Sequence, residues 1–209
     1  MSTLTLGYWN IRGLAEPIRM LLNYLSVPYK DELYEIGPPP EYNRDCWLNV
    51  KYKLGLDYPN LPYLYDGDFK MTESVAISRY ICGKYKPELL GESLKEKALV
   101  DMANGVLGDI LSAKVKLMYG GKDCEGHEML ENKLKNKLSD INKLLEKNKY
   151  LAGDKITYVD FICAEWCEGI NELLNPIFNE YKNIKRHFDE ICELPNIKKY
   201  RSEKKKMPY

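Results

Sequence analysis

Hydrophobic and polar positions follow one pattern in the first 85 residues and another pattern in the rest of the chain. Residues 4–6 alternate in the manner of a short strand, and residues 29–36 have the composition of a second strand. Between them an apolar stripe with the i, i+3, i+4, i+7 spacing of a helix is formed by Ile18, Leu21, Leu22 and Leu25. Pro17 falls in the first turn of this helix, where its missing N–H costs nothing. Two strands joined by one short helix are expected to be parallel.

Turn residues divide the next segment. Residues 37–40, Gly-Pro-Pro-Pro, force an extended loop, and a short helical turn is expected around Trp47. The pair Asp66-Gly67 indicates a hairpin of type I′ between strands at residues 63–65 and 68–71. Pro62 can open the first of these strands, and a cis bond before it is left open. A helix is expected from about Val75 to Gly83.

From Leu94 onward the pattern is helical throughout, and no repeat is visible. One stripe comprises Ala103, Val106, Leu107 and Ile110, and a second comprises Leu130, Leu134, Leu138, Ile141 and Leu145. Residues 119–121 (Tyr-Gly-Gly) separate the two stripes. Thr157 and Asp160 have the spacing of a capping box at the start of another helix, and residues 184–194 predict a further one.

These elements predict an α/β N-terminal domain of thioredoxin-like type, βαβ–ββα, with a mixed four-stranded sheet, followed by an all-α domain. The expected bounds are 1–84 for the first domain, 85–91 for a linker and 92–209 for the helical domain.

Charge and composition narrow the function. The 209 residues include 31 basic and 31 acidic side chains, and this zero net charge argues against a nucleic-acid partner. No apolar run has the length of a membrane span and the first residues lack a signal peptide, so we expect a cytoplasmic protein without a membrane partner. None of the six cysteines, which include Cys124, forms a C-x-x-C pair, and we expect them to be reduced and mostly buried. The two histidines lie far apart in the sequence and therefore suggest no metal site. The run at 204–206 is expected to be a solvated tail.

Candidate chemistry begins at Tyr8, which follows the first strand. Its hydroxyl could hold a ligand's thiol as a thiolate, or it could be a half-buried phenol bonded to a backbone carbonyl. Arg44, Trp47 and Lys51 could recognise an anion, or they could form a basic surface loop anchored by Trp47. Ser74 lies where free N–H groups of a helix start would also favour an anion.

Several stretches closely resemble the mu class of cytosolic glutathione transferases. They are residues 6–15 (LGYWNIRGLA), 47–49 (WLN), 53–57 (KLGLD), 59–64 (PNLPYL), 66–67 (DG) and 152–161 (AGDKITYVDF), and the segment from Gly37 to Trp47 matches the loop that marks mu enzymes. The resemblance spans essentially the whole chain.

The resemblance implies roles for individual residues. Tyr8 would stabilise the glutathione thiolate. The glutathione-binding set would be Tyr8, Trp9, Arg44, Trp47, Lys51, Asn60, Leu61, Glu73, Ser74 and Asp109, the last acting from the other subunit of a homodimer. The electrophile would meet Trp9, Ile11, Leu14 and Tyr119. Tyr58 and Arg79 would lie at the dimer interface.

The function implied by the resemblance is the transfer of glutathione to small hydrophobic electrophiles, which serves detoxification. Glutathione would be a co-substrate rather than a permanently bound cofactor, and no metal would be needed. A non-catalytic ligand-binding or structural dimer on the same fold is the alternative, and a related isomerase that acts on a lipid substrate with glutathione is left open. The missing C-x-x-C argues against a thiol–disulfide oxidoreductase. Glu73 replaces the Gln usual in mu members, with an effect on affinity that is open in either direction. The end of the chain at Tyr209 leads us to expect a more open hydrophobic site.

Overall fold

A computed structural model describes residues 3–120, 126–174, 176–203 and 207–208. The chain divides into two compact units, one formed by Met1–Tyr85 with Lys199–Tyr209 and the other by Lys86–Lys198. The last residues of the chain therefore group with the first unit, whereas the expected bounds assign them to the helical domain. Gly121, Cys124 and the basic run at 204–206 lie outside the described residues.

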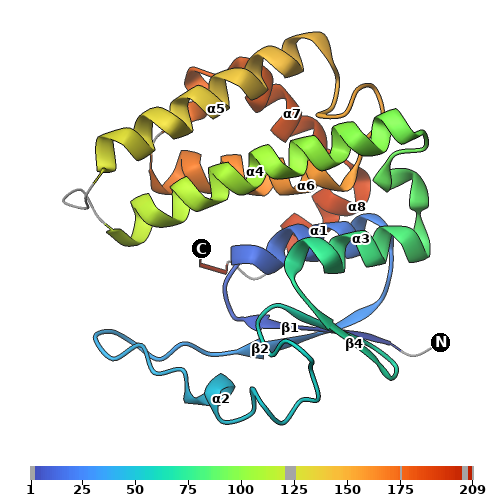
Figure 1. Ribbon diagram of the computed structural model, residues 1–209, viewed down its shortest axis with the longest axis vertical. Helices are drawn as coiled ribbons and strands as arrows, with labels where there is room; N and C mark the ends of the chain where they lie inside the picture. The colour runs from blue at the N-terminus through green and yellow to red at the C-terminus, as the bar shows by residue number, and fades with distance from the viewer. Residues whose placement is uncertain (1–2, 121–125, 175, 204–206, 209) are drawn as a thin grey trace. The chain divides into compact units, whose positions relative to one another are not determined.

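The first unit contains a four-stranded mixed sheet, as predicted (Figure 1). Its strands are β1 (Leu4–Trp9), β2 (Tyr29–Tyr34), β3 (Tyr63–Asp66) and β4 (Phe69–Thr72), in the order β2-β1-β3-β4. The pairing of β1 with β2 is parallel, and the other two pairings are antiparallel. The first strand is longer than predicted, because it continues through the Tyr-Trp pair.

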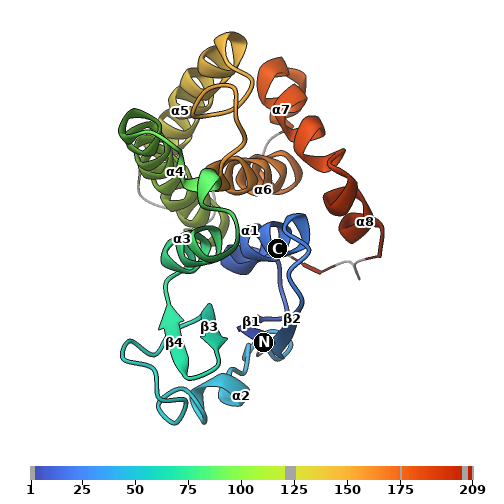
Figure 2. The same cartoon turned by 90° about the vertical axis from the view of Figure 1, so that its right-hand side faces the viewer.

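Helices α1 (Glu16–Tyr24) and α3 (Ser74–Tyr85) lie together over one face of this sheet, and the short α2 (Asp45–Leu48) lies on the other side (Figures 1 and 2). Pro17 is in the first turn of α1, and Ile18, Leu21 and Leu22 are buried. The predicted stripe is thus the face that packs on the sheet, except that Leu25 lies beyond the helix end and is half-buried.

A close contact inside the sheet explains one glycine of β1. A Cβ atom at Gly7 would lie 2.1 Å from the ring of Tyr63, with which Gly7 is paired across the strands. Such a distance is far below van der Waals contact, so position 7 has no room for a side chain.

The hairpin between β3 and β4 is present, but its turn is shifted by one residue from the prediction. Asp66 pairs with Phe69, so the two turn residues are Gly67 and Asp68. Type I′ needs a positive φ at both central residues. Gly67 has a φ of 61°, whereas Asp68 is not among the residues with positive φ, so the type I′ prediction is wrong.

The second unit is helical. It contains η2 (Pro87–Leu90), α4 (Leu94–Gly120), α5 (His127–Lys147), α6 (Tyr158–Leu173), η3 (Ile177–Asn179) and α7 (Lys182–Cys192); α8 (Pro195–Glu203) crosses the boundary between the units. Of the predicted stripe of α4, Ala103, Leu107 and Ile110 are buried and Val106 is half-buried. The buried face extends beyond the stripe to Val100 and Leu117, and α4 packs against both α5 and α6 (Figure 1). The predicted interruption at Tyr119-Gly120 is the end of α4.

The capping box of α6 is confirmed, and its carboxylate does more than cap the helix. Asp160 is completely buried and accepts hydrogen bonds from the backbone N–H and hydroxyl of Thr157 at 2.8 and 2.9 Å. Its other oxygen accepts from Leu151 N–H at 3.0 Å and lies 2.9 Å from Nε2 of His187 on α7. One carboxylate thus links α6, α7 and the loop before α6.

Cysteine burial is less uniform than expected. Cys82, Cys163 and Cys167 are buried, Cys192 is half-buried and Cys46 is exposed; each of these five has a free thiol. Among the helices of the described ranges, none has both the length and the apolar character needed to cross a membrane.

Candidate functional site

The register of the sheet brings four chain segments to one end of it. β1 ends at Trp9, opposite Tyr34 at the end of the parallel strand β2. Tyr63, the first residue of β3, pairs with Gly7 on one side and with Thr72, the last residue of β4, on the other. Strand ends at which helices begin are the usual ligand-binding edge of α/β sheets. The predicted glutathione residues of this unit occur in or beside these segments.

Tyr8 lies in β1 with an exposed fraction of only 6%, so its ring belongs to the core. Its hydroxyl oxygen accepts a hydrogen bond from the backbone N–H of Leu14 at 3.1 Å. Gly13 between them has a φ of +41°, and a Cβ there would lie 2.7 Å from the same hydroxyl. A phenol that accepts from an amide becomes a better donor through its own hydrogen, because adjacent hydrogen bonds polarise one another.

A buried arginine holds the turn that carries this amide. Arg19 is 1% exposed and donates from Nη1 to the carbonyl of Ile11 at 2.9 Å. Its Nε is 2.8 Å from a carboxylate oxygen of Asp31, and Glu16 lies 3.5 Å from Nη1. Burial alone would lower the pKa of Arg19, but Asp31 and Glu16 outweigh this effect and raise it, so the group stays charged. Tyr200 of α8 donates to Glu16 at 3.0 Å and joins the same network.

Sequence reasoning did not find the role of Arg19. The residue lies next to the apolar stripe of α1, and a charged side chain at such a position is ordinarily placed at the helix surface. The partners that keep it buried come from β2 and from the turn after β1, which the helical pattern does not reveal.

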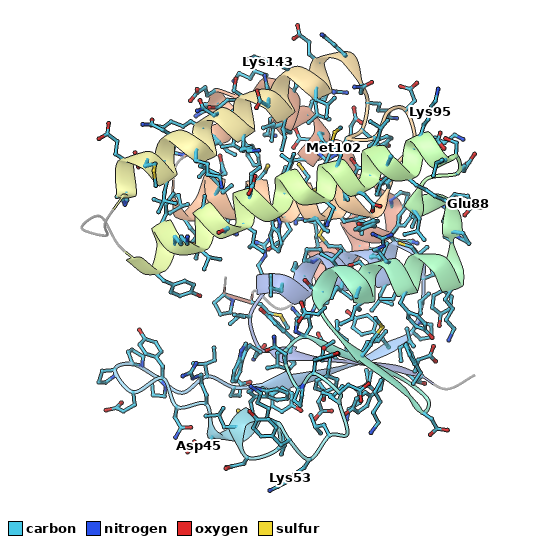
Figure 3. All side chains as sticks on the ribbon, viewed as in Figure 1. Asp45, Lys53, Glu88, Lys95, Met102 and Lys143 are labelled. Carbon is cyan, nitrogen blue, oxygen red and sulfur yellow. The ribbon has the colours of Figure 1, made fainter. Side chains whose placement is uncertain are left out.

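The loop around α2 carries the three residues predicted to recognise an anion, in the region marked by Asp45 and Lys53 in Figure 3. Trp47 is 4% exposed and packs on Tyr63 with a ring separation of 6.3 Å. This packing is what we expect if Trp47 anchors the loop to the core, which is the alternative to a role in anion recognition. Arg44 precedes α2 and is exposed, and Lys51 follows it and is half-buried, with its ammonium 5.4 Å from the ring of Tyr52. Both cations therefore border α2.

The segments before β3 and after β4 carry four further predicted residues. Asn60 is exposed, and Leu61 is buried directly before Pro62, with a cis bond between Leu61 and Pro62. Glu73 is exposed and has a φ of +73°, which is uncommon for a residue with a side chain. It precedes Ser74, the half-buried first residue of α3, so this turn presents free backbone N–H groups.

The predicted electrophile residues of the first unit, Trp9, Ile11 and Leu14, are half-buried near the end of β1. The predicted dimer residues are exposed. Tyr58 is 80% exposed although its carbonyl is fixed by the hydroxyl of Thr72 at 3.0 Å, and Arg79 is exposed on α3.

In the second unit, the two predicted residues lie on α4 and are accessible. The Asp109 side chain is 45% exposed and lies 3.1 Å from Lys137 and 3.3 Å from Lys133 on α5. Hydrogen bonds from Lys137 and then Lys133 lower the pKa of this carboxyl. Tyr119 is 76% exposed in the last turn of α4. A ligand of Asp109 would have to compete with two lysines of its own chain.

The arrangement at the sheet end suits an anionic ligand. It combines a buried phenol donor, two cations bordering α2 and a helix N-terminus. In the described ranges, no group of three or more His, Cys, Asp or Glu side chains is arranged to hold a metal ion.

Two family models match the chain. Residues 4–83 match the glutathione S-transferase N-terminal domain, and residues 108–204 match the glutathione S-transferase C-terminal domain.

Individual proteins match over nearly the full chain. A "Glutathione S-transferase" of Dermatophagoides pteronyssinus is 40% identical over 204 residues, covering 96% of this chain and 90% of the relative. "Glutathione S-transferase Mu 2" of Homo sapiens is 40% identical over 210 residues, covering 98% and 93%. The crystal structure of the glutathione S-transferase Blo t 8 is 32% identical, covers 95% of this chain and 92% of its own, and superimposes with a TM-score of 0.79.

Proposed function

Because the chain belongs to the glutathione S-transferase family, we propose that it transfers the sulfur of reduced glutathione to small hydrophobic electrophiles, with Tyr8 stabilising the thiolate. The observation that carries the role of Tyr8 is the hydrogen bond from Leu14 N–H to its hydroxyl oxygen. This bond uses a lone pair of the phenol oxygen and not its hydrogen, so the hydroxyl can still act as a donor toward sulfur.

The magnitude of one such bond is sufficient for the chemistry. A thiol has an ordinary pKa of about 8.5, and a hydrogen bond to a charged acceptor contributes about 1.5–3 kcal/mol. Since one pKa unit corresponds to about 1.36 kcal/mol, Tyr8 would lower the thiol pKa by roughly one to two units. The thiolate would then be the main form near neutral pH. Its sulfur would form the new bond to the electrophilic carbon, and the leaving group would depart with the bonding electrons.

The other predicted residues would hold the two ends of glutathione. Arg44, Trp47 and Lys51 would bind the glycyl carboxylate, with Asn60 beside them. Leu61 would pair with the cysteinyl backbone in the manner of an added strand.

The γ-glutamyl end would bind at the start of α3. Glu73 would accept from its ammonium group, and Ser74 would offer N–H and hydroxyl to its carboxylate. Trp9 would lie near the peptide and, with Ile11, Leu14 and Tyr119, would meet the electrophile.

A homodimer would complete this site. Tyr58 projects from the surface as an anchor for a second subunit would, and Arg79 would contribute to the same interface. Asp109 of one subunit would reach the γ-glutamyl ammonium bound to the other, in exchange for its contacts with Lys133 and Lys137. We place the protein in the cytoplasm, in detoxification.

The proposal is tested with Tyr8→Phe, which removes only the hydroxyl. Titration of the thiolate absorbance of bound glutathione should move its midpoint upward by roughly one to two pH units, while glutathione affinity stays nearly unchanged. Tyr85→Phe, a partly exposed tyrosine at the end of α3, is the matched control and should leave the titration as it is. An unchanged midpoint in Tyr8→Phe would contradict the role of Tyr8.

Retention on glutathione-agarose and conjugation of an aryl halide separate the enzyme from the non-catalytic alternative. The proposal expects both retention and turnover. Retention without turnover would favour a binding protein on the same fold.

A further inference from the structure

A cavity of about 390 Å³ lies inside the second unit, bordered by α4, α5, α6 and η3. Its apolar lining includes side chains that are at most 6% exposed, namely Leu117, Leu134, Leu138, Ile170 and Ile177. Protein interiors contain few voids larger than a water molecule, whereas small-molecule sites begin at about 300 Å³. The space therefore has the size and the lining of a ligand site rather than of a packing defect.

This cavity shares no residue with the glutathione and electrophile positions proposed above, although its wall comes close to one of them in sequence. Leu117 lines the cavity, and Tyr119 is two positions further along α4. Side chains two positions apart on a helix point in nearly opposite directions, since each residue turns by about 100°. Their burial agrees with this geometry, because Leu117 is 6% exposed and Tyr119 is 76% exposed.

The rim of the cavity is polar and carries two carboxylates together with His127 and Lys135. Glu131 is already paired within α5, with His127 at 3.4 Å and Lys135 at 3.9 Å. Glu180 also borders the cavity, and within the described ranges no cation forms an ion pair with it. Of the two rim carboxylates, Glu180 is therefore the one without a cationic partner among the described residues.

Tyr181, beside Glu180, adds a hydrogen-bonding group to the rim. Its ring is 8% exposed, and its hydroxyl donates to the carbonyl of Lys135 at 3.5 Å. Burial, followed by the nearby Glu180 carboxylate, raises the pKa of Tyr181, so the phenol carries no charge at neutral pH. The lining carries two carboxylates and one lysine, so its polar part is acidic overall beside apolar walls.

We propose that this cavity binds an apolar molecule with a single protonated amine, the hydrocarbon body lying against the leucine and isoleucine walls and the ammonium group lying at Glu180. An anionic ligand of the same shape would be repelled by Glu180, while the one lysine of the lining, Lys135, is paired with Glu131. A neutral ligand of the same shape would gain the apolar contacts without the charge interaction.

Three ligands of matched shape but different charge test, on the full chain, whether the cavity prefers a protonated amine. Calorimetric titration should give one site for 1-naphthylmethylamine, with weaker binding of 1-naphthylmethanol and the weakest binding of 1-naphthylacetic acid. Saturation with S-hexylglutathione should leave the binding of the amine unchanged. Equal or tighter binding of the acid, or loss of the amine when S-hexylglutathione is present, would overturn the proposal.

Variants at the rim locate the site without disturbing the core. Leu173, also in the lining, is 44% exposed, so Leu173→Trp fills the mouth and should weaken the amine about ten-fold, which is about 1.4 kcal/mol. Glu180→Gln should weaken the binding of the amine about three-fold and leave the binding of the alcohol unchanged. Glu172→Gln, an exposed neighbour outside the lining, is the control and should change neither. Unaltered amine binding in Leu173→Trp, with a wild-type circular dichroism spectrum, would show that the ligand binds elsewhere.

Discussion

Tyr8 in the first unit is 6% exposed and its hydroxyl is fixed by a backbone amide, whereas Tyr119 in the second unit is 76% exposed at the end of a helix. The charged side chains of the two units differ in burial in the same way. Arg19 is 1% exposed and bridges two carboxylates and a carbonyl, whereas Asp109 is 45% exposed and lies between two lysines.

The difference indicates which parts of the proposed chemistry are preorganised. A group held by buried partners keeps its geometry before any ligand arrives, and this is how binding sites avoid the cost of ordering. A group held by exposed ion pairs can exchange partners at little cost. We infer that the thiolate-stabilising end of the site is built into the fold of the first unit, and that the α4 residues take up their roles only when a ligand or a second subunit arrives.

The largest effect is expected from removing the buried cation. Arg19→Met removes the cation that is paired with Asp31 and Glu16, and breaking a buried ion pair in this way typically costs about 3–5 kcal/mol. The urea midpoint should fall strongly, and thiolate formation should fall with it, because the Ile11 carbonyl loses its donor. Lys137→Met removes a cation from the exposed pair and is the matched control; a comparable loss of stability in both variants would abolish the contrast between the units.

A smaller effect, confined to activity, is expected at the turn after β1. Gly13→Ala places a methyl group 2.7 Å from the Tyr8 hydroxyl at a φ of +41°, so the phenol must move. A displacement of about 1 Å can reduce catalysis about 100-fold, and we expect kcat/KM to fall by one to two orders of magnitude. Gly105→Ala on α4, where a Cβ would meet nothing within 4 Å, should stabilise the helix by about 0.5–1 kcal/mol in urea unfolding. If both variants kept full activity, the turn could not be what orients Tyr8.

The smallest effect concerns how stability depends on pH through the exposed ion pairs of Asp109 with Lys133 and Lys137. The pKa of Asp109 is lowered by Lys137 and Lys133, so its contribution to stability is present at neutral pH and is lost as the pH falls below about 4. Urea midpoints of the wild type and of Asp109→Asn should differ slightly at pH 7, and the difference should shrink progressively as the pH falls below about 4. Asp140→Asn, at an exposed position of α5, serves as the control. A difference of the same size at pH 7 and in acid would assign the effect to packing rather than to charge.

The sequence predicts most of the fold because its signals are local. Alternation, the apolar stripes and the Thr157–Asp160 spacing each specify an element without reference to distant residues, and the thioredoxin-like sheet and helical second half are confirmed. The matches to mu-class relatives confirm the family resemblance.

The failures occur where distant residues decide the outcome. Helix α8 was not predicted, because Pro195 directly after Leu194 reads as the end of a helix although proline is equally suited to start one. The hairpin turn is shifted to Gly67 and Asp68 by the strand pairing rather than by the turn residues alone. The network of Arg19 joins α1, β2 and α8, and no local pattern contains those three segments. For the predicted site residues, the sequence identifies the residue types, while their assignment to glutathione stays a prediction.

The contact between Gly7 and the ring of Tyr63 also constrains how this chain can diverge. Any side chain at position 7 requires a smaller residue at position 63 beforehand, and Tyr63 is in turn held by the Tyr34 hydroxyl at 3.0 Å and by Trp47. Substitutions in this part of the sheet are therefore accessible only in a fixed order, so descendants of this sequence should alter the α4 surface long before they alter the strand that carries Tyr8.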